Sequence, residues 1–112
     1  MPELSKKLKA ALKEHAGRAW EAEMRVVLEG LAAKFDQWKA GAISTADLSD
    51  AIHDYHNGAA REIWRRFATN DPKMPLAHAV ASGVVSKESL PAEVVDHIAS
   101  MVEFFSEREE NG

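Results

Sequence analysis

The chain has 112 residues and a net charge of −4, with 46% hydrophobic and 29% charged residues. This length fits one domain, and the composition is that of an ordinary globular protein rather than a disordered or fibrous one. The absence of cysteine excludes disulfide frameworks, thiolate nucleophiles and cysteine-ligated zinc or iron–sulfur centres.

The distribution of charge and apolar residues bears on location and partners. No apolar run approaches the ~18 residues that a membrane span needs, and the N-terminal residues lack the apolar segment of a signal peptide. We therefore expect a cytoplasmic protein without a membrane partner. Residues 1–20 carry a net charge of +3, and residues 86–112 carry −5. The net negative charge disfavours nucleic acid as a partner, because phosphate binding requires clustered positive charge.

Helical spacing of apolar residues runs through the whole chain. It predicts a first helix over Glu3–Ala16, followed by Gly17 as either a break or a tolerated weak point. A second helix is predicted over Arg18–Ala40, and Gly41 is placed to end it. The second helix has one apolar stripe, which we expect to be core: Trp20, Met24, Val27, Leu28, Leu31, Phe35 and Trp38.

A third helix is predicted over Thr45–Thr69. Ser44 with Asp47 three residues later is typical of a helix N-terminus, and Pro72 marks the end because it disfavours helical geometry in the residue before it. The second and third helices would each be about 35 Å long. Since only four residues join them, we expect an antiparallel hairpin.

The C-terminal third predicts a short helix over Leu76–Ser82 and a last helix from Pro91 to Arg108. The predicted fold is therefore all-α. We expect residues 1–112 to form a single compact bundle of four to five helices, built on the hairpin of residues 18–40 and 45–69. Residues 3–16 and 91–108 are expected to pack against that hairpin, and the tail is expected to be frayed from about residue 108.

The third helix carries the candidate site residues. Its apolar residues spread over about 200°, so more than one side should be covered, either within the chain or by another chain. His53 and His56 lie at the edge of this arc, where they are either a pair of metal ligands or structural histidines with hydrogen-bond partners. Trp64 lies at the rim, a position that favours an interface anchor.

Motifs for chemistry are absent from the sequence. It has no nucleophile elbow and no phosphate-binding glycine loop. Residues 79–90 imitate a helix-turn-helix, but Pro91 would fall inside its recognition helix. Arg61, Arg65 and Arg66 could contact single-stranded nucleic acid, although Glu62 is placed to pair with Arg65 or Arg66 instead.

We therefore expect a protein–protein interaction or self-association module without catalytic activity. Its partner would be a second copy, as a homodimer, or another protein, and we infer no cofactor and no small-molecule substrate. Two alternatives remain: a metal-binding helical protein that uses His53 and His56, and a nucleic-acid accessory protein. The interaction residues are predicted to be His53, His56 and Trp64.

Overall fold

The computed structural model describes residues 5–69 and 71–111, with side chains as far as Arg108. Every regular element in these ranges is helical, which confirms the all-α prediction. The elements are α1 (Lys6–Lys39), α2 (Thr45–Asp54), the π-helical turn η1 (Tyr55–Ala59), α3 (Ala60–Phe67), α4 (Lys73–Ala81), the 3₁₀ turn η2 (Lys87–Ser89) and α5 (Ala92–Asn111).

Helix α1 runs without interruption through Gly17, so the two helices predicted on either side of that glycine are one. Glycine costs a helix interior about 1 kcal/mol relative to alanine, which local and tertiary contacts outweigh here. Arg18 is paired with Glu14 at 2.8 Å across the glycine. Ala16 and Ala19 are buried on the same face on both sides of it. The helix begins after Ser5, whose Oγ accepts a hydrogen bond from the backbone N–H of Leu8.

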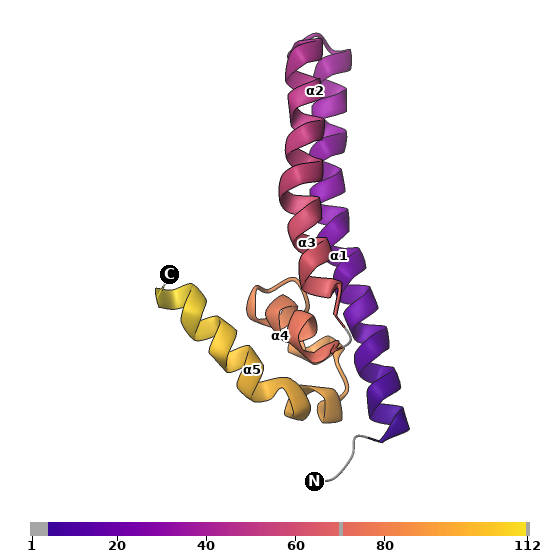
Figure 1. Cartoon of the computed structure of the whole chain (residues 1–112), viewed down its shortest axis with the longest axis vertical. Coiled ribbons are helices and arrows are strands. Elements are labelled where there is room, and N and C mark those ends of the chain that lie inside the picture. The colour runs from indigo at the N-terminus through magenta and orange to yellow at the C-terminus, as the bar shows by residue number, and fades with distance from the viewer. Residues whose placement is uncertain (1–4, 70, 112) are drawn as a thin grey trace.

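The predicted hairpin is confirmed, and both of its turn signals act as expected. Gly41 adopts φ 78°, and the N–H of Ala42 donates to the carbonyl of Gln37 at 2.8 Å, which closes α1 with a Schellman motif. Ser44 and Asp47 form a reciprocal capping box at the start of α2. The chain therefore reverses direction over Gly41–Ser44, and α2, η1 and α3 return beside α1 (Figure 1).

The returning arm contains a π-helical turn that the sequence analysis did not predict. The N–H of Ala60 donates to the carbonyl of Tyr55, five residues back, so η1 accommodates one extra residue. The extra residue removes roughly 100° of rotation between α2 and α3. As a result, Leu48 before the turn and Ile63 after it are both buried.

The core lies at the base of the molecule, not in the hairpin. It is formed by the N-terminal half of α1 together with α4, Leu90 and α5. Its fully buried large side chains are Leu12, Leu76, Val94 and Ile98. The hairpin arm adds only Leu48 and Ile63 to the buried apolar residues. Residues 6–16 and α5 thus pack with α4 at the base, whereas we expected them to cover the hairpin.

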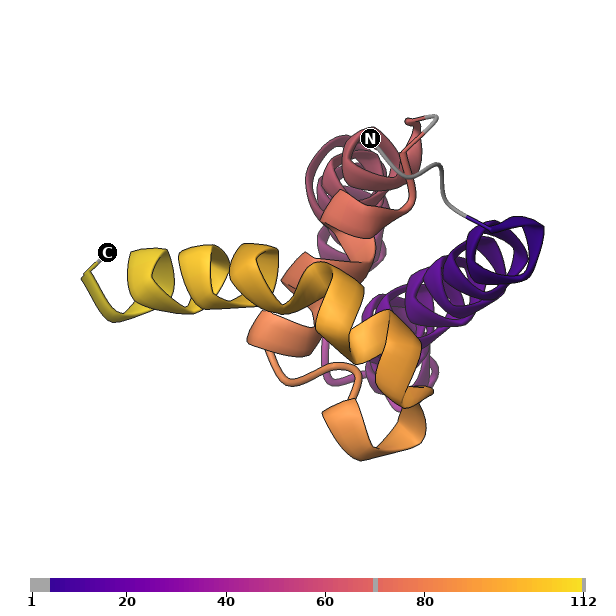
Figure 2. The same cartoon turned by 90° about the horizontal axis from the view of Figure 1, so that it is seen from below.

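The molecule is more elongated than the compact bundle that we expected. Its radius of gyration is 17.2 Å, against about 13 Å for a compact chain of this length. Its extents are 59 × 32 × 23 Å, because the hairpin projects from the base along the direction of α1 (Figures 1 and 2).

Several boundaries also differ from the predictions. Helix α4 begins at Lys73, three residues before the expected Leu76. Helix α5 begins at Ala92 and continues to Asn111, beyond Arg108 where fraying was expected. The predicted start at Glu3 lies outside the described residues. Within those residues, none of the helices combines the length and the apolar character that crossing a bilayer requires.

Candidate interaction surface

Large apolar side chains remain exposed along one side of the hairpin. Trp20 is 43% exposed, Trp38 is 38% exposed and Trp64 is 67% exposed, so the prediction that Trp20 and Trp38 are core residues is wrong. A hairpin of only two helices has no third layer to cover the outer part of each apolar stripe. We call the exposed set the hairpin face; its residues are Trp20, Leu28, Phe35, Trp38, Ile52 and Trp64.

The helical geometry places the hairpin face on a single side of the arm. At 100° per residue, its four members on α1 fall within about 80° of one another. On the returning arm, the π turn brings Ile52 and Trp64 close to the same direction, since it removes roughly 100° of rotation between them. Trp20 and Trp64 line the same hollow, which shows that the two arms present their apolar residues on the same side.

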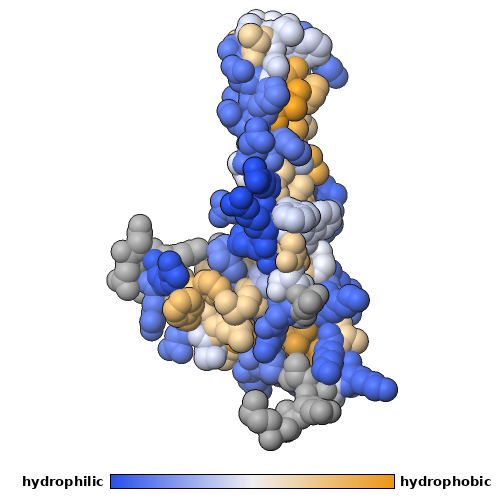
Figure 3. Space-filling view, viewed as in Figure 1, coloured by the Kyte–Doolittle hydropathy of each residue, from blue (hydrophilic) through white to orange (hydrophobic). Residues whose placement is uncertain are grey.

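The space-filling view shows the surface of the hairpin from one side. Apolar side chains run along the right-hand part of the projecting arm, and hydrophilic side chains cover its left-hand part (Figure 3). At the tip, Trp38 is held in place because its indole Nε1 donates to Thr45 Oγ1 at 3.1 Å. This bond fixes one end of the hairpin face.

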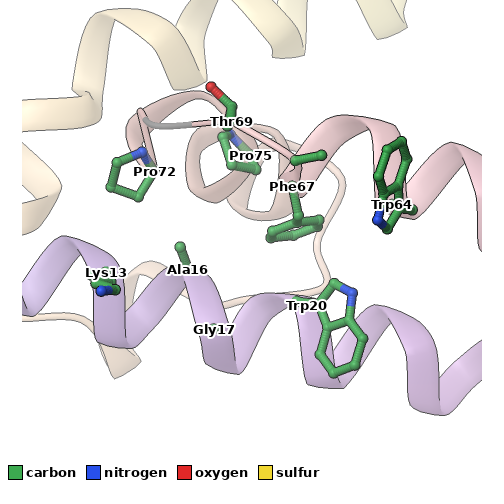
Figure 4. A pocket seen from close by; sticks show the side chains of 10 residues that line it. Lys13, Ala16, Gly17, Trp20, Trp64, Phe67, Thr69, Pro72 and Pro75 are labelled. Atoms are coloured by element: carbon green, nitrogen blue, oxygen red, sulfur yellow. The ribbon is translucent and has the colours of Figure 1, made fainter.

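The base of the hairpin face opens into an aromatic hollow with a volume of about 430 Å³. Trp20 of α1 and Trp64 of α3 stand on opposite sides of it, with Phe67 between them (Figure 4). Pro72 and Pro75 close it toward the base, and Lys13 is the charged residue in its lining. Walls of this kind suit an apolar side chain from a partner, because aromatic rings supply a large contact area at low entropic cost.

The structure separates the three residues predicted as interaction sites. Among the large apolar residues that the structure describes, Trp64 is the most exposed, and it belongs to the hairpin face. His53 is exposed in α2, and His56 is exposed in η1. Among the described residues, no group of three His, Asp or Glu side chains is placed to hold a metal ion, so the histidine pair lacks the further ligands that zinc needs.

The opposite side of the hairpin carries a polar cluster that sequence reasoning missed. Arg66 donates to Glu23 Oε1 at 2.7 Å, and the same nitrogen lies 3.1 Å from Nδ1 of His78. Of the two partners expected for Glu62, Arg65 or Arg66, Arg66 is therefore paired with Glu23 instead. A signal was available in the sequence, because Glu23 lies on the α1 stripe between Ala19 and Val27 at spacings of four residues. The cluster joins α1, α3 and α4, and thereby fixes the hairpin on the base.

The structure also bears on the two segments that were considered as nucleic-acid sites. Arg61 and Arg65 are exposed, whereas Arg66 is committed to Glu23. Residues 79–90 do not form a helix-turn-helix: α4 ends at Ala81, η2 follows, and the next helix begins only at Ala92. Comparison with protein-family models, with curated protein sequences and with solved structures found no significant match.

Proposed function

We propose that this protein is a protein–protein interaction module and that the hairpin face is its binding surface. The observation that carries the proposal is the exposure of six large apolar side chains on one side of a projecting arm. Apolar surface costs free energy in water, at about 25 cal/mol per Å². Contiguous patches of this kind typically mark interaction sites.

The structure of the base supports the hairpin face as the binding surface. The buried core gives the base its own stability, and the Glu23–Arg66–His78 cluster holds the arm on it. The arm is thereby free to present its face without contributing most of the core. We assign the module no catalytic step and no metal, and we expect it to act in the cytoplasm.

Site-specific photo-crosslinking in living cells tests the binding surface. A benzophenone amino acid replaces Phe35 in one variant and Val26 in the other. Both residues are exposed and apolar, and both belong to α1, but their separation of nine positions places Val26 on the opposite side of the helix. We expect protein adducts from position 35 and none from position 26. Adducts from both positions alike, or none from position 35, would contradict the proposal.

A further inference from the structure

The hairpin face has the area of one half of a stable interface. The two arms lie side by side from Trp20 to Trp38, a length of about 30 Å, and two helices are about 20 Å wide. The face therefore covers about 600 Å² on each copy, or about 1,200 Å² for two copies in contact. This lies at the lower end of the range for specific protein–protein interfaces.

The charges around this face are mixed in sign. On α1, Glu21 and Lys39 are exposed at opposite ends of the arm. On the returning arm, Arg61 lies near the base, about 60° from Trp64 around α3, whereas Asp50 lies near the tip on the other side of α2 from Ile52. Residues 18–39 carry four basic and four acidic groups, and residues 45–67 carry three and four, so the arm is nearly neutral.

This balance distinguishes between classes of partner. A nucleic acid or an anionic lipid surface requires a basic face, and a strongly acidic or basic peptide requires the opposite charge. A near-neutral rim with both signs is compatible with a copy of itself, because the edge of α1 offers an acidic end at Glu21 and a basic end at Lys39 to a second arm. A second copy also offers an apolar face of the same length as the face that it would cover.

We propose, on the basis of the function proposed above, that a second copy of this chain covers the hairpin face. Two hairpins pack face to face about a two-fold axis and form a four-helix bundle with a shared apolar interior. The aromatic hollow between Trp20 and Trp64 is then closed by apolar side chains of the other copy. The two bases lie outside the shared bundle, and each keeps the core that it has in the single chain.

Sedimentation velocity and multi-angle light scattering on the full chain test this pairing. The variant Leu28→Asp places a charge in the hairpin face, and Val26→Asp places the same charge on the other side of α1. We expect a dimer for the wild-type chain, a dimer dissociation constant raised about tenfold or more for Leu28→Asp, and no comparable change for Val26→Asp. Helical circular dichroism shows whether each variant is folded, and Trp64→Ala provides a second test that adds no charge.

The outcomes separate this inference from the function on which it rests. A wild-type chain that stays monomeric at high micromolar concentration overturns the pairing, as does a dimer that Leu28→Asp and Trp64→Ala leave unchanged. If the monomeric chain still forms adducts with a different protein from position 35, the interaction function stands and the partner is not a second copy. If it forms none, both proposals fail.

Discussion

Nη1 of Arg66 lies 2.7 Å from Oε1 of Glu23, although the two residues are 43 positions apart in the chain. Glu23 is only 8% exposed, and its second carboxylate oxygen is buried without a hydrogen-bond partner. A guanidinium group only donates, so Nδ1 of His78 accepts the bond from the same Arg66 nitrogen. The ring of His78 in turn meets the ring of Phe105 edge to face at 5.4 Å. One arginine thus connects the hairpin to α4 and, through His78, to α5.

Replacing Glu23 with alanine should destabilise the protein by about 2–3 kcal/mol. Removal of one partner leaves the other charge buried and uncompensated, which costs about 3–5 kcal/mol for a fully buried pair. The cost is lower here because 25% of the Arg66 side chain is exposed, so that water can partly solvate the charge that Glu23 leaves unpaired. Urea unfolding measures the free energy of unfolding. The matched control is Glu29→Ala, which removes an exposed pair with Arg25 and should change stability by less than about 0.5 kcal/mol. Equal effects of the two substitutions would show that the Glu23 pair is not structural.

Gly17 and Gly41 should respond to alanine with opposite signs. Gly17 lies inside α1, and a Cβ there would have no atom within 4 Å, so Gly17→Ala should stabilise the protein by about 0.5–1 kcal/mol. Gly41 has φ 78°, a conformation that costs an alanine about 1–2 kcal/mol. Thermal unfolding of the two variants compares them directly. A destabilising Gly17→Ala would indicate that α1 is not continuous at this residue.

The sequence predicted the hairpin because its signals are local. Gly41, the Ser44–Asp47 capping box and Pro72 each act within a few residues, so their spacing was enough to locate the turn and the end of the arm. The continuity of α1 could not be predicted in this way. The low helix propensity of glycine predicts a break at Gly17. The helix continues because Ala16 and Ala19 are buried against helices that are distant in the sequence.

The candidate surface was predicted only in part, for a related reason. Helical periodicity identified the apolar stripe of residues 20–38, but it does not tell which parts of a stripe another helix covers. That depends on where α4 and α5 pack, which is at the base. Trp64 was correctly placed at the rim, because its position on the helix was already at the edge of the arc. The pairing of Glu23 with Arg66 required knowledge of the fold.

Deletion of Gly58 should be tolerated. The π turn Tyr55–Ala59 holds one residue more than an α-helical turn, so its removal lets α2 and α3 join as a regular helix with Leu48 and Ile63 still facing α1. We expect a change in the free energy of unfolding within about 1 kcal/mol. The control is deletion of Ala33, an exposed residue in the regular helix α1. It rotates the tip by about 100°, removes Leu48 from its contacts and should cost about 2 kcal/mol or more. A similar loss for both deletions would mean that the π turn is required by the packing.

Tryptophan fluorescence should report association, because Trp20, Trp38 and Trp64 are the three tryptophans of the chain and all belong to the hairpin face. In the single chain they are partly in water, so their emission should lie at long wavelength. When a second hairpin covers them, water is removed from the rings and the emission should move to shorter wavelength as protein concentration rises. The spectrum of Leu28→Asp should stay at long wavelength over the same range, whereas Val26→Asp should follow the wild-type chain. A dimer detected by light scattering with no change in emission would place the interface away from the hairpin face.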